Sequence, residues 1–143
     1  MMKPDAVQRG FIGEIISRFE KKGIKIAAMK LVSVDRKLAE KHYGVHKGKP
    51  FFEPTVKYII SSPVVAMVLE GVNVIETVRG MTGATDPQKA AMGTIRGDYG
   101  QFIGRNIVHG SDSKETAKFE INLWFTPEEI TEYTRIDEKW LTE

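Results

Sequence analysis

The spacing of hydrophobic and polar positions predicts alternating helices and strands. Between Phe11 and Phe19, apolar residues recur every three or four positions, which is typical of an amphipathic helix. Residues 24–34 are rich in β-branched side chains, and residues 63–71 form a continuous apolar run of strand length. Both runs therefore predict strands.

The rest of the chain continues this alternation. Helices are expected over residues 36–43, 51–62, 72–80 and 114–125, and a last strand over residues 106–109. Asp35 is the expected N-cap of the helix over residues 36–43. TPEE (residues 126–129) fits a capping box. Residues 80–105 are rich in glycine and lack sustained periodicity, which predicts a long functional loop.

This order of elements predicts a fold class. Without the additional helices it reduces to βαββαβ, which is ferredoxin-like. We therefore expect an α+β fold in which helices pack on one face of an antiparallel four-stranded sheet, with a C-terminal extension. Residues 1–143 are expected to form a single domain.

Composition narrows the function classes. The chain has no cysteine, which excludes disulfides, zinc–thiolate sites and thiol catalysis. Its formal net charge of +2 is too small to indicate nucleic-acid binding. The sequence has neither a run of apolar residues long enough to span a membrane nor a signal-peptide pattern, so a cytoplasmic location is expected.

Phosphate chemistry, if present, would depend on scattered side chains. The sequence lacks a P-loop, a dinucleotide-binding glycine motif and the protein-kinase motifs. Lys3, Arg79, Arg96 and Arg105 each lie beside an expected element end or a glycine turn, where they could hold phosphate oxygens. The alternative is that they are ordinary solvated charges.

His109 differs from the other two histidines. It follows the apolar pair Ile107 and Val108 at an expected strand end, whereas His42 and His46 lie in a polar segment and are expected at the surface. An imidazole in this position can be structural, a general base or a nucleophile, and the residues alone leave these alternatives open.

Three segments resemble signature segments of nucleoside diphosphate kinases. They are KPDAVQRG (residues 3–10), TIRGDYG (94–100) and GRNIVHGSDS (104–113). FFEPTVKYIISSPVVAMVLEGVNVI (51–75) and EINLWFTPEEI (120–130) are also similar to the family. The resemblance covers nearly the whole chain in order.

The resemblance implies ping-pong transfer of the γ-phosphate from a nucleoside triphosphate to a nucleoside diphosphate. His109 matches the family's nucleophile, which becomes phosphorylated on Nδ1. The residues that match nucleotide contacts are Lys3, Phe51, Arg79, Thr85, Arg96 and Asn106, and Phe51 would stack on the base. Tyr43 matches a tyrosine beside the phosphates, and Ser111 and Glu120 match residues that orient the histidine.

The resemblance also implies a cofactor and an assembly. Mg²⁺ is expected to arrive with the nucleotide phosphates, without a protein-built metal site. A homo-oligomer is expected, with a hexamer favoured over a tetramer; no nucleic-acid or membrane partner is indicated. The chain departs from the family at Thr55, near the base, and at its start. With only Met1 and Met2 before Lys3, either the first strand is short or the sequence given begins within it.

Two other functions share some of these features. A ferredoxin-like RNA-binding module would contain an aromatic-rich strand motif, which the sequence lacks. A phosphohistidine relay acting on proteins would share the nucleophile, but it would not need the side chains that contact base and sugar.

Overall fold

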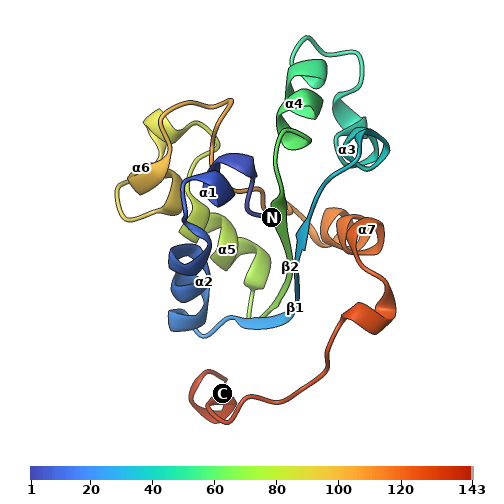
Figure 1. Cartoon of the computed structure of the whole chain (residues 1–143). Coiled ribbons are helices and arrows are strands. Elements are labelled where there is room, and N and C mark those ends of the chain that lie inside the picture. The colour runs from blue at the N-terminus through green and yellow to red at the C-terminus, as the bar shows by residue number, and fades with distance from the viewer. Residues whose placement is uncertain (143) are drawn as a thin grey trace.

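An antiparallel pair of strands lies at the centre of the structure, a computed structural model that describes residues 1–142 (Figure 1). Strand β1 (Lys25–Val32) pairs with β2 (Val64–Glu70), with Met29 opposite Met67. A bulge between Ile26 and Ala28 interrupts the register. Both strands lie where the apolar runs predicted them.

The predicted four-stranded sheet is wrong in its number of strands. Met2 forms isolated bridges to Val65 and to Val108, so the first and last segments lie in the ferredoxin-like order but do not extend into strands. Pro4 begins a helix directly after Lys3, and Ile107 has a left-handed backbone with φ of 71°. Each break limits pairing to one residue because a ladder needs consecutive extended residues.

The helices largely match the predicted ranges. They are α1 (Pro4–Gln8), α2 (Ile12–Lys21), α3 (Arg36–His42), α4 (Phe52–Ile59), α5 (Val74–Thr82), α6 (Ile95–Tyr99) and α7 (Lys114–Trp124). The 3-10 turns are η1 (Gly44–His46), η2 (Pro87–Lys89), η3 (Pro127–Glu129) and η4 (Glu138–Trp140). Asp35 caps α3, as predicted, and the predicted capping box at Thr126 is present but begins the 3-10 turn η3. The sequence analysis did not predict α1, which has a single turn.

The segment 80–105 is not the irregular loop that its glycines predicted. It contains η2, which Asp86 caps, and α6, whose N-cap Thr94 accepts a hydrogen bond from the Gly97 amide. Each element is too short to produce a hydrophobic period, so only its cap could have revealed it.

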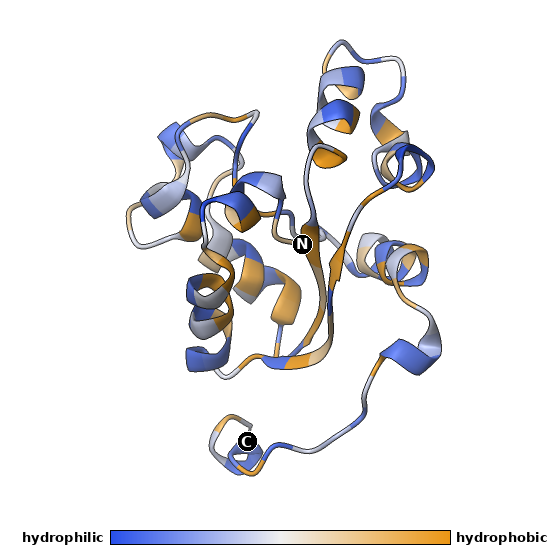
Figure 2. Ribbon diagram, in the orientation of Figure 1, coloured by the Kyte–Doolittle hydropathy of each residue, from blue (hydrophilic) through white to orange (hydrophobic). Residues whose placement is uncertain are grey.

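Apolar clusters cover both faces of β2, and this corrects the expectation of helices on one face only. Val64, Ala66 and Val68 pack with residues of α3, α4 and α7. Val65 on the opposite face packs with residues of α1, α2 and α6, with α5 at the edge of the cluster. Since both faces are buried, β2 is hydrophobic from Val64 to Leu69 and ends in Glu70 (Figure 2).

The last part of the chain runs along β1. The Thr131 amide donates to the Ala27 carbonyl, and the Tyr133 hydroxyl donates to the Ile26 carbonyl at 3.0 Å. Ile136 and Trp140 remain 97% and 79% exposed. Among the described residues, no helix has the length and apolar character needed to cross a membrane.

Gly97→Ala is expected to destabilise the segment that carries Arg96. A Cβ on Gly97 would lie 2.1 Å from the Ala91 carbonyl oxygen, which is backbone and cannot move aside alone. We expect the free energy of unfolding, measured with urea, to fall by about 1–3 kcal/mol. Gly104→Ala is the matched control, because its Cβ would meet no atom within 4 Å. Equal stability of the two variants would contradict this packing.

Candidate active site

The main chain at His109 is fixed from two sides. The His109 amide donates to the Met1 carbonyl, and the Met1 amino group donates to the His109 carbonyl, each at 2.8 Å. The carbonyls of Asn106 and Val108 accept hydrogen bonds from the Arg96 guanidinium. The backbone position of the histidine therefore does not depend on a regular strand.

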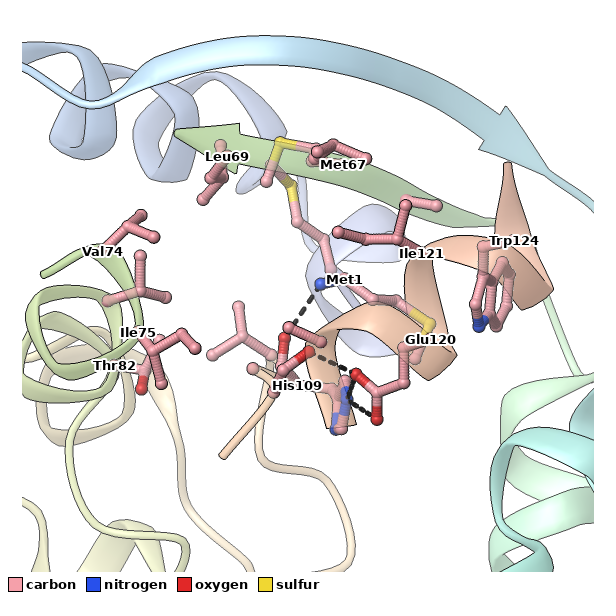
Figure 3. A pocket seen from close by; sticks show the side chains of 18 of the residues that line it. Met1, Met67, Leu69, Val74, Ile75, Thr82, His109, Glu120, Ile121 and Trp124 are labelled. Carbon is pink, nitrogen blue, oxygen red and sulfur yellow. Dashed lines mark hydrogen bonds and ion pairs between the residues drawn. The ribbon is translucent and has the colours of Figure 1, made fainter. Parts of the chain in front are cut away.

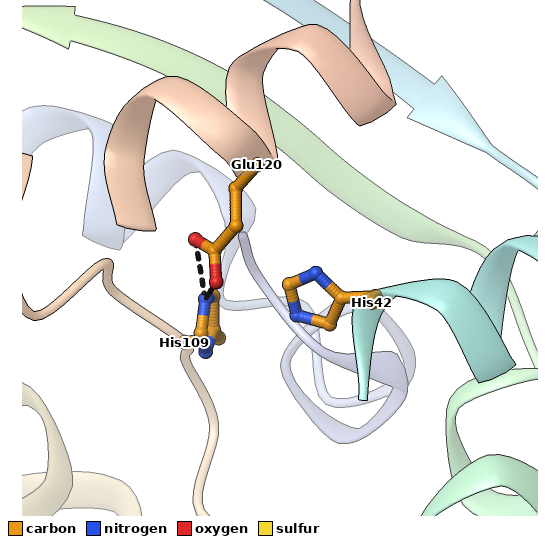
Figure 4. Close-up of side chains that lie close together, drawn as sticks. All are labelled: His42, His109 and Glu120. Carbon is orange, nitrogen blue, oxygen red and sulfur yellow. Dashed lines mark hydrogen bonds and ion pairs between the residues drawn. The ribbon is translucent and has the colours of Figure 1, made fainter. Parts of the chain in front are cut away.

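Glu120, on α7, determines which nitrogen of His109 can react. Both Glu120 carboxylate oxygens lie 2.9 Å from His109 Nε2, and the Ser111 hydroxyl donates to the same carboxylate at 2.5 Å (Figure 4). A carboxylate can only accept, so Nε2 carries the proton. In the neutral ring Nδ1 then has the free lone pair, and it points away from Glu120 (Figure 4).

Burial and ion pairing act in opposite directions on this pair. Burial lowers the pKa of His109 below its ordinary value, although Glu120 acts to raise it. For Glu120, burial acts to raise the pKa, but the hydrogen bonds from His109 and Ser111 hold it at about 2. The carboxylate is therefore ionised at neutral pH beside a neutral imidazole that can act as a nucleophile.

His42 is buried beside His109, which contradicts its expected place at the surface. It ends α3, is 7% exposed, and its ring lies edge-on to the His109 ring at 4.6 Å between centroids. The indole nitrogen of Trp124 donates to His42 Nδ1 at 3.1 Å. The spacing of Ala39 and His42, three residues apart on α3, could have placed both on its buried face.

Tyr43 is also buried at this end of α3, and its hydroxyl has no hydrogen-bond partner within the described residues 1–142. Its side chain is 8% exposed, and burial raises its pKa above the ordinary value, with the Glu120 charge acting in the same direction. The hydroxyl therefore stays protonated and remains available as a donor.

Arg96 is largely engaged in holding the backbone. Besides the Asn106 and Val108 carbonyls, it donates to the Gly83 carbonyl at 2.7 Å. Burial, with the charge of Arg79, lowers its pKa to about 10, so it remains charged at neutral pH. A guanidinium has five N–H donors, and three are engaged here, so two remain for a ligand.

Lys3, Asn106 and Thr85 form a connected group. The Lys3 ammonium donates to Asn106 Oδ1 at 2.6 Å, and Asn106 Nδ2 donates to the Thr85 carbonyl at 2.9 Å. Burial, with the nearby charge of Arg96, lowers the pKa of Lys3 to about 8. The Thr85 side chain is exposed and free to meet a ligand.

The positions of Arg79 and Phe51 relative to His109 follow from less direct observations. Arg79 is exposed on α5 and lies close enough to Arg96 for its charge to affect the pKa of Arg96. Phe51 precedes α4, is 49% exposed and packs against His46. Among residues 1–142, no hydrogen bond or ring contact joins it to the other predicted site residues. The structure therefore brings most of the predicted residues together around His109 and leaves Phe51 at a separate, accessible position.

A cavity of about 140 Å³ lies behind the histidine (Figure 3). Met67 and Leu69 of β2, Val74 and Ile75 of α5, and Ile121 of α7 are among its apolar lining residues, and His109 and Glu120 are among the polar ones. An apolar cavity does not suit a polyphosphate. It contributes to the desolvation of His109, and a charged ligand is expected outside it.

The residues at the site do not form a magnesium site. His42, His109 and Glu120 are the one group of three or more histidine or carboxylate side chains in residues 1–142 whose donor atoms lie within 4.8 Å of one another. Mg²⁺ prefers oxygen ligands, and both Glu120 oxygens are already engaged by His109 and Ser111.

Acid is expected to destabilise the protein through His42. Burial, with the charge of His109, lowers the pKa of His42 to about 3 from the ordinary 6.5. Below pH 6.5, His42 is therefore protonated in the unfolded chain but stays neutral in the native state. The free energy of unfolding consequently falls as the pH drops toward 3.

This single group can contribute a slope of at most about 1.4 kcal/mol per pH unit. Urea unfolding at several pH values should show a shallower slope for His42→Gln, which retains the contribution of Glu120. Identical slopes for parent and variant would show that His42 already titrates normally in the folded protein.

Comparison with known proteins identifies the family. The sequence profile described as Nucleoside diphosphate kinase matches residues 1–130. A nucleoside diphosphate kinase from Pelotomaculum thermopropionicum is 61% identical over 143 residues, which are 100% of this chain and 96% of the relative. One from Pyrococcus furiosus is 63% identical over 138 residues, 94% of this chain and 86% of the relative.

Solved structures agree with these sequence relatives. A halophilic nucleoside diphosphate kinase from Halobacterium salinarum, in complex with CDP, superposes with a TM-score of 0.97 at 46% identity, covering 99% of this chain and 95% of that one. A nucleoside diphosphate kinase family protein from Babesia bovis gives 0.96 at 45% identity, with the same coverage. The chain belongs to the nucleoside diphosphate kinase family.

Proposed function

We propose that this nucleoside diphosphate kinase transfers phosphate through His109, which is phosphorylated on Nδ1. The observation that supports this most directly is the contact of both Glu120 oxygens with Nε2. It commits the proton to one nitrogen and leaves a lone pair on the other, which faces away from the carboxylate. A hydrolase base would need a serine or water nucleophile held at Nδ1, and no side chain within residues 1–142 is bonded there.

The proposed transfer begins at Nδ1 of His109. The Nδ1 lone pair attacks the γ-phosphorus of a nucleoside triphosphate, a nitrogen–phosphorus bond forms, and the bond from phosphorus to the bridging oxygen breaks. The nucleoside diphosphate leaves with that electron pair. The proton stays on Nε2, where Glu120 stabilises the positive charge that develops on the ring. Attack by a second nucleoside diphosphate reverses these events and frees His109.

The remaining site residues would bind the nucleotide. The two uncommitted N–H groups of Arg96, with exposed Arg79 and Thr85, would hold phosphate oxygens. Lys3 and Asn106, already bonded to each other, would reach the sugar hydroxyls. The exposed face of Phe51 would stack on the base, which requires no particular base because all have a π-face.

Mg²⁺ would be held by the nucleotide phosphates rather than by a protein cage. When bound it would neutralise phosphate charge and help to orient the leaving group. The cationic side chains around His109 would supply the rest of the charge stabilisation.

Labelling with γ-³²P-ATP tests the role of His109. We expect an acid-labile, alkali-stable label on the parent protein, complete loss of that label in His109→Ala, and transfer of the label to added GDP. The physical reason is that no other imidazole at the site has a free, accessible lone pair, because Trp124 engages His42 Nδ1.

His46→Ala is the matched control, because the His46 ring packs against Phe51, at the position separate from His109. It should label like the parent. Label that remains on the protein in the presence of GDP or CDP would contradict the proposal and favour a relay to protein partners.

We also propose a homo-oligomer, with a hexamer favoured, located in the cytoplasm. Met29 and Leu31 on β1 are 51% and 63% exposed, and Ile136 and Trp140 are also exposed. Exposed apolar side chains two residues apart on one strand are consistent with a protein interface.

Leu31→Glu is therefore expected to reduce the mass that light scattering measures, because it places a charge in the proposed interface. The parent should give a multiple of 16.1 kDa, six-fold for a hexamer. Val72→Glu is the control, since Val72 is 65% exposed outside β1 and should leave the mass unchanged. A monomeric parent would rule out the assembly.

A further inference from the structure

The Nε2 nitrogen of His42 is a buried polar group with no hydrogen-bond partner among residues 1–142. Buried polar groups in native proteins are nearly always paired, so an exception calls for an explanation. His42 is only 7% exposed, and it has no role in the transfer proposed for His109.

The hydrogen bond from Trp124 determines that His42 Nε2 carries the proton. The indole N–H of Trp124 can only donate, and it donates to His42 Nδ1 at 3.1 Å. Nδ1 is therefore the acceptor nitrogen of a neutral ring, and the proton lies on Nε2. Burial holds the pKa of His42 far below its ordinary value, so the ring stays neutral at physiological pH. His42 thus presents an N–H donor of fixed position.

This donor lies beside the reacting group. The ring centroids of His42 and His109 are 4.6 Å apart at an interplanar angle of 80°, and Figure 4 shows an edge of His42 turned toward His109. One ring nitrogen of each histidine and one Glu120 oxygen lie within 4.8 Å of one another. A phosphoryl oxygen on His109 would extend two covalent bonds beyond Nδ1, and this reach would bring it toward the donor.

We propose that His42 is a catalytic residue whose Nε2–H donates a hydrogen bond to a phosphoryl oxygen on His109. This inference rests on the phosphorylation of His109 proposed above. The donor has no acceptor in the part of the chain that the structure describes, and it would gain an anionic one when the phosphate is attached. Since hydrogen bonds to charged acceptors are stronger than neutral ones, His42 stabilises the phosphorylated enzyme relative to the free enzyme.

A metal site is the other explanation for this cluster, because His42, His109 and Glu120 group their donor atoms. Metal binding at His42 Nε2 would require the proton to move to Nδ1, where it would face the Trp124 N–H. Binding at Nδ1 would break the bond from Trp124. The tautomer that Trp124 imposes therefore favours a hydrogen-bond donor over a metal ligand.

The equilibrium between ATP and the phosphorylated enzyme tests the proposal. The full-length parent, His42→Gln and His42→Leu are mixed with γ-³²P-ATP and Mg²⁺ at fixed ratios of ATP to ADP, and the protein-bound label is measured after an alkaline quench. Glutamine places an amide N–H near the position of Nε2, whereas leucine fills the space without a donor.

We expect His42→Leu to shift this equilibrium toward ATP by about tenfold or more, and His42→Gln to restore most of the label. Circular dichroism and ADP affinity serve as controls that folding and nucleotide binding persist. A merely structural role would lower the active fraction of protein but would not move the ratio at which the active fraction is half labelled.

Nitrogen-15 NMR of histidine-labelled protein provides a second measurement that does not depend on a variant that folds. In the free protein the His42 signals should show a proton on Nε2, and this proton resonance should move downfield when His109 is phosphorylated. An unchanged resonance, or the proton on Nδ1, would overturn the proposal. So would Zn²⁺ that binds the parent stoichiometrically through His42.

The outcomes separate this inference from the proposed function. Absence of label on the parent would overturn both. A labelled parent, with the same equilibrium in folded His42→Leu, would overturn the role of His42 alone and leave His109 as the phosphate carrier.

Discussion

The hydrogen bond from His109 Nε2 to Glu120 is the interaction on which the chemistry of this site depends. Without it, the two ring nitrogens would compete for the proton, and the nucleophilic lone pair would be present for only part of the time. Ser111 donates to the same carboxylate, which keeps it ionised and in place. A half-buried carboxylate on α7 therefore fixes the reactivity of a residue on a different segment.

The fold supports this bond in an indirect way. The segment that carries His109 is not a strand, because Ile107 adopts a left-handed backbone. Pairing with Met1 and the donors of Arg96 replace the missing ladder. The Asn106–Val108 segment is thus held by side chains, and it can turn away from the sheet to present the imidazole at its end.

The sequence predicted the two strands and the longer helices because their hydrophobic periods are several residues long. It could not predict the reduced sheet, since β-branched Ile107 gives no warning of a positive φ. The candidate site came from resemblance rather than from periodicity. His42 was assigned to the surface because its neighbours in sequence are polar, whereas its burial depends on contact with Trp124, which is distant in sequence.

Arg96 shows why fold and function cannot be separated at this site. Three of its donors hold the carbonyls of Gly83, Asn106 and Val108, so the charge proposed to meet phosphate also keeps the histidine segment in place. Its position is set before any ligand binds, which reduces the entropy lost when phosphate is bound. Loss of activity on removing Arg96 would therefore combine a missing phosphate contact with a displaced nucleophile. The Nε2 nitrogen of His42 bonds to no other group within residues 1–142, so its contribution to transfer is easier to separate from its contribution to folding.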